Sequence, residues 1–152
     1  NKNIMAAVDD IKKLRDVTGA GVMECKQAIA DSKGDFDAAI KLIHERGLAK
    51  VEKRAGREAG AGLIQSYVHN ERIGVILDVR AETDFVVRSE PFKTLAKDLA
   101  MQIAAAGPAN VEELLKQPYI KDESRTVDEI IKLTIAQVGE NIQVKTFSRL
   151  EL

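Results

Sequence analysis

The sequence of 152 residues contains one cysteine and no tryptophan, and aromatic residues make up only 4% of it. The single cysteine, Cys25, excludes an internal disulfide and a metal site built from several cysteines. The shortage of aromatic rings argues against base-stacking surfaces for nucleic acids and against aromatic ligand cages. No apolar run approaches the roughly 18 residues of a membrane-spanning helix, so we expect no membrane partner.

The sequence also has no excess of one charge sign. It contains 23 Lys and Arg and 24 Asp and Glu, for a formal net charge of −1. This balance excludes a basic surface over the whole protein and argues against direct binding of nucleic acid. Hydrophobic residues reach 45% and charged residues 31%, which is typical of a folded chain. A lone thiol fits a reducing compartment, so we expect a cytoplasmic protein.

Signatures of catalysis and of cofactor binding are missing as well. The two histidines, His44 and His69, have no second His or Cys at ligand spacing. The sequence has no P-loop and no nucleophile elbow, and its two Gly-Ala-Gly segments lack the third glycine of a dinucleotide loop. Cys25 lies on an apolar helix face, as buried and inert thiols do. We therefore expect no cofactor, no metal site and no covalent catalysis.

Residues 1–47 are predicted to form a small domain of three helices. Apolar residues recur at helical spacing in three segments, with glycines between them that permit positive φ. The predicted apolar faces are Val8, Ile11 and Leu14; Val22, Cys25, Ala28 and Ile29; and Phe36, Ala39, Ile40 and Ile43. Asp35 is a natural N-cap for the third helix, and Arg46-Gly47 is typical of a helix end. Residues 48–58 are polar and locally basic, and they are predicted to form an exposed linker helix.

Residues 59–152 are predicted to form an α+β core domain that begins with a hairpin. Two runs rich in β-branched residues, 62–69 and 73–81, flank a short polar turn. The second run is apolar nearly throughout, as in a central strand covered on both faces.

Two helices and a last strand complete the predicted core domain. One helix has Pro91 in its first turn and stops at Gly107, and the next begins at Thr126 and ends at Gly139. Alternating residues from Ile142 predict a third strand, with a bulge at Thr146-Phe147. The result is a three-stranded antiparallel sheet packed by helices.

Three stretches fit contact with a partner better than catalysis. Leu14–Val22 joins the first two helices, Tyr67–Arg72 forms the tip of the hairpin, and Thr83–Val86 places a carboxylate beside a large aromatic ring. Composition alone favours plainer interpretations, namely a helix–helix turn and a solvated hairpin tip. In the third stretch it favours a Phe85 tucked into the core and an Asp84 that caps the next segment.

Together, these stretches resemble the bacterial elongation factor Ts family in a short single-core form. The similar segments are Leu14-Arg15, Thr18-Gly19-Ala20-Gly21-Val22-Met23, Cys25-Lys26-Gln27-Ala28, Gly34-Asp35-Phe36-Asp37-Ala38-Ala39, Arg72-Ile73-Gly74-Val75, Glu82-Thr83-Asp84-Phe85-Val86 and Gly139-Glu140-Asn141-Ile142. They occur in the family's order over nearly the whole chain, which makes the resemblance specific.

The resemblance implies a guanine-nucleotide exchange factor that binds elongation factor Tu, either GDP-bound or free of nucleotide, and lets GTP replace GDP. It implies an N-terminal three-helix UBA-like domain, a linker, and an α+β core that can dimerise. Displacement of the partner's magnesium is implied for Thr83, Asp84, Phe85 and Val86. Partner binding is implied for Leu14, Arg15, Thr18, Gly19, Ala20, Gly21, Val22, His69 and Arg72. In longer relatives, the histidine that resembles His69 lies in a second copy of the core, near the partner's phosphate-binding loop.

The sequence also departs from the family. Gly107–Gln117 is short, and the second core with its coiled-coil insert is absent. Phe147-Ser148-Arg149 stands where some single-core relatives carry a cysteine that joins two chains, so a non-covalent homodimer is the remaining dimer hypothesis. A pure interaction module is the alternative function, and an enzyme is a distant third.

Overall fold

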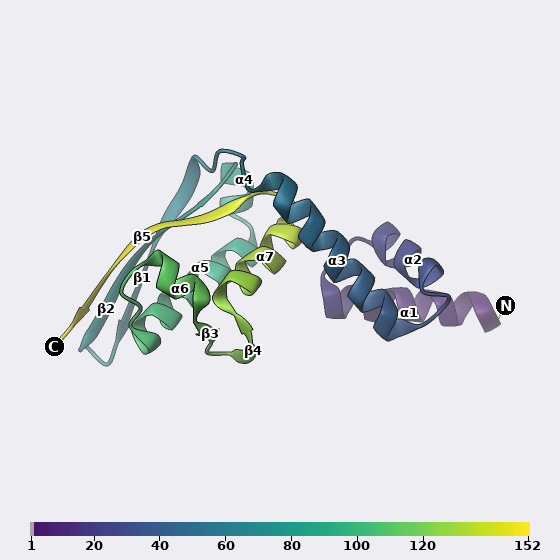
Figure 1. Cartoon of the computed structure of the whole chain (residues 1–152), viewed down its shortest axis with the longest axis horizontal. Coiled ribbons are helices and arrows are strands. Elements are labelled where there is room, and N and C mark those ends of the chain that lie inside the picture. Colours follow the sequence, from purple (N-terminus) through teal and green to yellow (C-terminus); the bar gives the residue numbers. More distant parts are fainter. Residues whose placement is uncertain (1) are drawn as a thin grey trace. The chain divides into compact units, whose positions relative to one another are not determined.

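The computed structural model describes the backbone of residues 2–152 and the side chains of residues 8–152. The chain forms two compact units, Asn1–Lys53 and Arg54–Leu152, which are described one at a time. The first unit is helical (Figure 1). Its helices are α1 (Lys2–Thr18), α2 (Val22–Asp31) and α3 (Phe36–Arg54).

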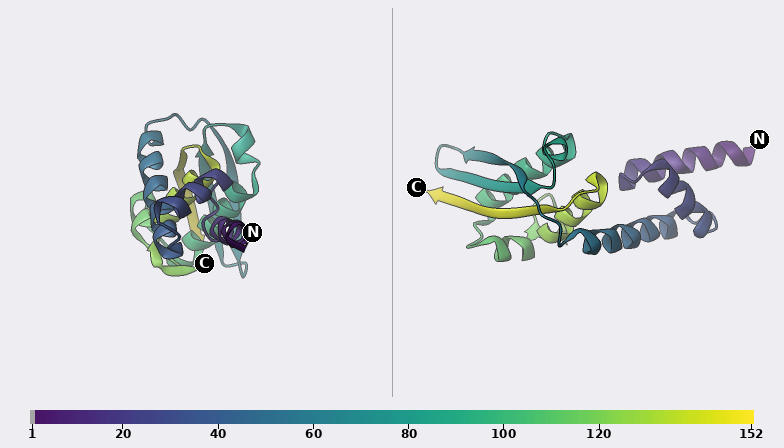
Figure 2. Two further views of the ribbon diagram at one scale, coloured as in Figure 1. Left: turned by 90° about the vertical axis from the view of Figure 1, so that its right-hand side faces the viewer. Right: turned by 90° about the horizontal axis from the view of Figure 1, so that it is seen from above.

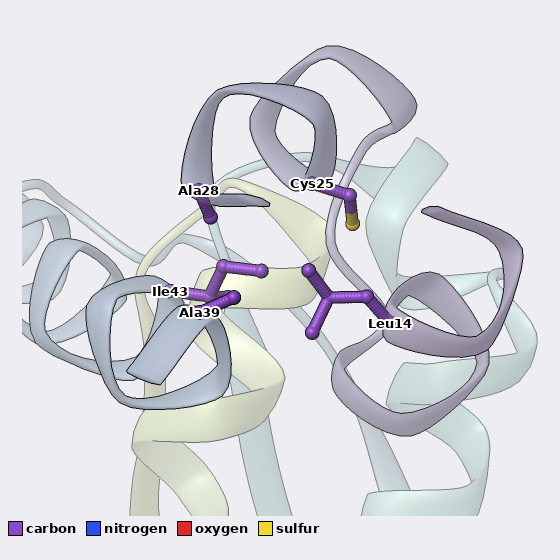
Figure 3. Close-up of a cluster of buried hydrophobic side chains, with 5 residues drawn as sticks. All are labelled: Leu14, Cys25, Ala28, Ala39 and Ile43. Atoms are coloured by element: carbon purple, nitrogen blue, oxygen red, sulfur yellow. The ribbon is translucent and has the colours of Figure 1, made fainter. Parts of the chain in front are cut away.

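The core of the first unit lies where the three helices meet. Leu14 of α1 and Ile43 of α3 point toward each other, and Cys25 of α2 lies beside them (Figure 3). The five buried residues are Leu14, Cys25, Ala28, Ala39 and Ile43. These positions confirm the predicted apolar faces. The turn before α3 is also as predicted, since the Asp35 carboxylate accepts a hydrogen bond from the N–H of Ala38 at 3.0 Å.

Two details of the first unit differ from the prediction. Helix α3 does not stop at Gly47 but continues to Arg54, because Gly47 keeps a helical conformation and strong helix formers follow it. Val8 and Val22 are exposed rather than buried. Each is the first residue of its predicted apolar face, and a small three-helix unit buries only part of its apolar surface.

The second unit is an α+β structure with a three-stranded antiparallel sheet in the order β1-β2-β5. A two-stranded sheet, β3-β4, lies apart from it. The elements are β1 (Ala61–His69), β2 (Ile73–Ala81), α4 (Asp84–Val87), α5 (Glu90–Ala106), α6 (Val111–Lys116), β3 (Pro118–Tyr119), β4 (Asp122–Thr126), α7 (Val127–Val138) and β5 (Ile142–Glu151). The helices of this unit lie on one side of the large sheet (Figures 1 and 2).

The middle strand, β2, is covered on one face only, which corrects the prediction of two covered faces. Leu77 and Val79 are fully buried against the helices, whereas Ile76 between them is 57% exposed. The prediction was wrong because a nearly continuous apolar run was taken to mean two buried faces. Strand side chains alternate between two faces, and the face that carries Ile76 is left exposed although the residue is apolar. The open face of the sheet therefore carries apolar side chains without a covering layer.

The ends of the two long helices follow the predicted signals. Pro91 lies in the first turn of α5, and Gly107 ends it in the left-handed conformation at φ 56°. At the start of α7, Thr126 and Glu129 form a capping box in which each side chain accepts the other's backbone N–H. The predicted bulge is displaced slightly, because β5 shifts register between Val144 and Thr146.

A buried amide anchors the β3-β4 hairpin, which the sequence did not predict. Gln102 of α5 is fully buried, and its Nε2 donates to the carbonyl of Pro118 at 3.1 Å and to Oε1 of Gln117 at 3.3 Å. Its Oε1 accepts the N–H of Ile120 at 2.9 Å. Because each buried polar atom of this side chain has a partner, the hairpin is fixed to α5 without a large apolar core.

Replacing Gln102 by alanine is predicted to lower the free energy of unfolding by about 2–3 kcal/mol, since it leaves buried groups of the hairpin without partners. Denaturant unfolding followed by circular dichroism measures this. The matched control is Gln137→Ala, because Gln137 is exposed on α7, and its change is expected within about 0.5 kcal/mol. Equal effects of the two substitutions would contradict the anchoring role.

Candidate functional site

The turn between α1 and α2 holds most of the residues implied to bind a partner. Gly19 has φ 69°, a conformation that favours glycine, and its N–H donates to the carbonyl of Arg15 at 2.7 Å. Thr18 Oγ1 donates to the carbonyl of Leu14 at 2.6 Å and accepts the N–H of Ala20 at 3.3 Å. These contacts hold the turn in one conformation. Leu14 is fully buried, so it supports the turn from inside the unit.

Exposed apolar side chains surround this turn. Val17 precedes it, and Val22 and Met23 follow it, with exposed fractions of 63%, 49% and 74%. Neither Val17 nor Met23 was among the predicted site residues, although both lie in or beside the predicted stretch. Large apolar groups gathered at one exposed turn are typical of a contact surface.

The tip of the β1-β2 hairpin is a tight polar turn. Asn70 and Glu71 have φ of 49° and 59°, and the N–H of Arg72 donates to the carbonyl of His69 at 3.0 Å. The exposed His69 ring is hydrogen-bonded on both sides, through Nδ1 to the hydroxyl of Tyr67 at 2.9 Å and through Nε2 to Asn70 at 3.2 Å. The imidazole is thus held at the tip of the hairpin and presented to solvent.

Arg72 also contacts the residue that follows the last strand of the sheet. Its Nη2 donates to the carbonyl of Leu152 at 3.2 Å, and its own carbonyl accepts the N–H of Leu152 at 2.9 Å. Part of its side chain is therefore engaged within the chain, in addition to any contact with a partner.

The stretch after β2 presents an aromatic ring to solvent. Phe85 is 85% exposed, whereas the next two residues, Val86 and Val87, are buried. The side chain of Thr83, not that of Asp84, caps the short helix α4 by accepting the N–H of Val86 at 3.4 Å. The plainer interpretation, in which Phe85 packs in the core and Asp84 is the cap, is therefore wrong, and both side chains are free to meet a partner.

Two glutamates hold the start of this stretch to the two residues just before β5. The Glu140 carboxylate accepts the N–H of Thr83 at 2.9 Å and the hydroxyl of Thr83 at 2.8 Å. In the opposite direction, Glu82 accepts the N–H of Asn141 at 2.8 Å. Sequence reasoning missed these contacts, because nothing in the sequence places Thr83 beside residue 140.

The hairpin tip and the Phe85 stretch lie at opposite ends of the sheet (Figures 1 and 2). Strand β2 separates them, and its nine residues, at about 3.3 Å each, place them roughly 30 Å apart. One core therefore brings Thr83, Asp84, Phe85 and Val86 together but keeps His69 and Arg72 away from them.

Other kinds of site find no support in the part of the chain that the structure describes. No group of three or more His, Cys, Asp or Glu side chains could hold a metal ion there. Within the same residues, no helix is long and apolar enough to cross a membrane. Cys25 is buried, and burial raises the pKa of its thiol above the ordinary value.

Comparisons with known proteins identify the family. The model of the family described as elongation factor TS matches residues 82–152. The chain is 39% identical to an elongation factor Ts of Rippkaea orientalis over 189 aligned residues, which cover 93% of this chain and 76% of the relative. It is 38% identical to one of Synechocystis sp., with 93% and 87% covered, and 37% identical to one of Thermodesulfovibrio yellowstonii, with 93% and 94% covered. The chain belongs to the elongation factor Ts family.

As a member of the elongation factor Ts family, the chain is a translation elongation factor. The 189 residues aligned with two relatives exceed the 152 residues of the chain, so those relatives contain residues with no counterpart here. The matched part of this elongation factor Ts, residues 82–152, begins at the glutamate before Thr83 and includes Glu140 and Asn141.

The reactivity of Cys25 measures how often the α1–α2 turn opens, since its Sγ donates to the carbonyl of Ala20 in that turn at 3.8 Å. A disulfide reagent at pH 7 is predicted to react about a hundredfold more slowly with Cys25 than with a cysteine peptide, because reaction needs both local opening and a thiolate. Absorbance of the released thiol measures the rate. Denaturant is expected to abolish the difference, and a native rate equal to the peptide's would contradict burial.

Proposed function

We propose that this chain is a guanine-nucleotide exchange factor that binds elongation factor Tu, GDP-bound or nucleotide-free, and promotes the replacement of GDP by GTP. The observation that supports this most directly is the exposure of Phe85, on a one-turn helix whose last two side chains, Val86 and Val87, are buried. An aromatic ring held rigidly in water is suited to enter a cleft of another protein. The factor changes no covalent bond, so it needs neither a nucleophile nor a cofactor.

The proposed mechanism acts on the partner's magnesium ion. Nucleotide phosphates in such partners are held by a phosphate-binding loop and by Mg²⁺, which offsets their charge. Insertion of Phe85 shifts the helix that carries a magnesium ligand, and Asp84 re-aims polar groups around the ion. Thr83 and Val86 hold both residues in place. Once the ion is displaced, the phosphate charge is less compensated and GDP dissociates faster.

We propose that residues 1–47 form a UBA-like domain that docks on the nucleotide-binding domain of elongation factor Tu. The exposed Val17, Val22 and Met23 around the α1–α2 turn support an apolar contact there. The proposed contact residues are Leu14, Arg15, Thr18, Gly19, Ala20, Gly21 and Val22. Residues 48–58 then serve as a linker to the core domain of residues 59–152. Because its partner works in translation, we propose a cytoplasmic location.

Replacing Phe85 by alanine is predicted to slow exchange at least about fivefold, since loss of a coupling contact of 1–3 kcal/mol changes affinity 5- to 150-fold. The assay loads elongation factor Tu with fluorescent GDP, adds the chain and excess GTP, and follows release. Because Phe85 is exposed, its replacement is expected to change stability by less than about 0.5 kcal/mol. The control is Ile120→Ala, which removes another exposed apolar side chain far along the chain.

Two outcomes would contradict the proposal. If the unmodified chain binds elongation factor Tu without accelerating release, the pure interaction module is the better description. If the chain accelerates release but Phe85→Ala and Asp84→Ala both leave the rate intact, the magnesium mechanism is wrong. Equal slowing by Ile120→Ala would point to general loss of binding rather than to Phe85.

We further propose that the chain forms a non-covalent homodimer through the open face of its sheet. The large apolar residues of this face are Ile64, Val68, Ile76 and Leu150, all more than half exposed. Val68, Gly74 and Leu150 lie side by side across the three strands. Ile76 lies two residues after Gly74 on β2, so its side chain is on the same face. The open face thus carries four large apolar side chains, interspersed with the small polar Ser66 and Ser148 beside Ile76, and exposed apolar groups of this kind pack on another sheet.

Two observations favour a second copy of this chain as the occupant. His69 and Phe85 lie at opposite ends of one core, so two cores are needed to bring both to one nucleotide site. Two charges of the open face are also paired with each other, because Arg80 Nη2 contacts the Asp78 carboxylate at 2.8 Å and the guanidinium lowers the pKa of that carboxyl. A neutralised pair costs less to cover than an isolated charge. In the dimer, His69 and Arg72 of one copy contact the partner bound by Phe85 of the other.

Light scattering is predicted to give a mass about twice the 16.7 kDa of the chain. The Ile76→Lys variant is predicted to have the single-chain mass, because a lysine at the centre of the open face cannot be buried without a partner charge. Ile120→Lys is the control, since it adds the same charge outside that face. A single-chain mass for the unmodified protein, alone and with elongation factor Tu, would contradict the dimer.

A further inference from the structure

Glu140 makes a contact that no candidate role explains. It follows Gly139, the left-handed residue that ends α7, and precedes β5. Both oxygens of its carboxylate are used by one residue, since Oε1 accepts the N–H of Thr83 at 2.9 Å and Oε2 accepts the hydroxyl of Thr83 at 2.8 Å. Hydrogen bonds to a carboxylate are roughly twice as strong as those between neutral groups.

This contact controls the cap of α4. When the Thr83 hydroxyl donates to Glu140, its oxygen is left aimed at the N–H of Val86, which donates to it at 3.4 Å. Helix α4 has only four residues, too few to be stable by itself. The direction of Phe85 therefore depends on what holds the two ends of the helix. Buried Val86 and Val87 hold its C-terminal half, and Thr83 with Glu140 holds its start.

A reciprocal contact fixes the same two chain segments to each other. Glu82 accepts the N–H of Asn141, just as Glu140 accepts the N–H of Thr83. Asn141 is buried, and its Nδ2 donates to the carbonyl of Arg57 at 2.8 Å. The paired residues 82–83 and 140–141 thus form a rigid base for the exposed Phe85.

We propose that Glu140 is a positioning residue for nucleotide exchange: it holds Thr83 so that Asp84 and Phe85 are already oriented before they meet elongation factor Tu. This inference rests on the proposed function. Both carboxylate oxygens of Glu140 are engaged by Thr83, so its effect passes through Thr83. An oriented ring loses little conformational freedom on insertion, whereas a mobile one must be ordered during exchange. Affinity supplied by the N-terminal unit does not depend on this contact.

The test measures fluorescent GDP release from elongation factor Tu at rising concentrations of the full chain, which separates the maximal rate from the half-saturating concentration. Glu140→Ala is predicted to lower the maximal rate about tenfold or more, because small misplacements of a reacting or inserting group cost up to about a hundredfold. The half-saturating concentration is expected to stay within about twofold, since the N-terminal contact is intact. Glu140→Gln, which can still accept the N–H and donate to the hydroxyl of Thr83, is predicted to restore most of the rate.

The matched control is Glu129→Ala. Glu129 also accepts a threonine N–H, that of Thr126 at 2.8 Å, at the start of α7. Its loss is predicted to lower the melting temperature by a similar amount while leaving both exchange parameters unchanged. Amide hydrogen exchange gives a second readout, in which Glu140→Ala lowers the protection of the Val86 N–H and Glu129→Ala does not.

The outcomes separate this inference from the proposed function. If the unmodified chain accelerates release and Phe85→Ala slows it, but Glu140→Ala does not, the positioning role alone is overturned. Equal slowing of GDP release by Glu129→Ala and Glu140→Ala would also overturn it. So would a Glu140→Gln variant that loses as much of the maximal release rate as Glu140→Ala does, provided that both variants are as stable as Glu129→Ala. If the unmodified chain has no effect on release, the proposed function fails and this inference fails with it.

Discussion

The pairing of β2 on both of its edges is the constraint on which the second unit depends. Every residue of Ile73–Ala81 is paired with β1 on one side and with β5 on the other. Because side chains alternate between faces, a slip of one residue would bury Ile76 and expose Leu77 and Val79. The same strand carries the hairpin tip at one end and leads into Thr83 at the other. Its register therefore sets the covered core, the open face and the spacing of His69 from Phe85 together.

The use of phenylalanine shows what the fold leaves unburied. Of four phenylalanines, Phe92 is fully buried, Phe36 and Phe147 are half-buried, and Phe85 is almost fully exposed. Leaving such a side chain in water forgoes about 1.5–3 kcal/mol of burial. The core takes the smaller Val86 and Val87 instead of the adjacent ring. In a chain so poor in aromatic residues, this arrangement favours burial of Phe85 in a complex over a role in folding.

Local signals predicted most of the fold, and contacts between distant segments account for what they missed. The caps at Asp35, Thr126 and Gly107 each depend on residues within one helical turn, so the sequence was sufficient to predict them. Helix α3 passed through Gly47 because its continuation depends on the residues after that glycine. Gln102 reads as a polar interruption of an apolar face, and its burial is explained only by the hairpin that it anchors.

In the candidate site too, local contacts could be predicted from the sequence, whereas contacts between distant segments could not. Composition favoured a buried Phe85, and only the resemblance to a family predicted its use in contact. Neither could predict that Glu140, distant in the sequence, would hold Thr83, because that contact exists only once β2 and β5 are paired. A site built on a paired sheet is thus fixed by long-range register, whereas the α1–α2 turn is fixed by the contacts of Thr18 and Gly19 within a few residues.

The division of the proposed contact among three surfaces bears on how such a factor can leave its partner. Each surface is small: a turn with three exposed apolar side chains, a hairpin tip and one aromatic ring. Surfaces of this size bind weakly one by one, and linkage within one chain or one dimer makes their joint affinity high. By reciprocity, if binding of the factor weakens binding of nucleotide, an incoming nucleotide weakens binding of the factor by an equal ratio. Once the proposed Phe85 contact is lost, the proposed contact at the α1–α2 turn still holds the complex, and dissociation then requires only the loss of that weaker contact.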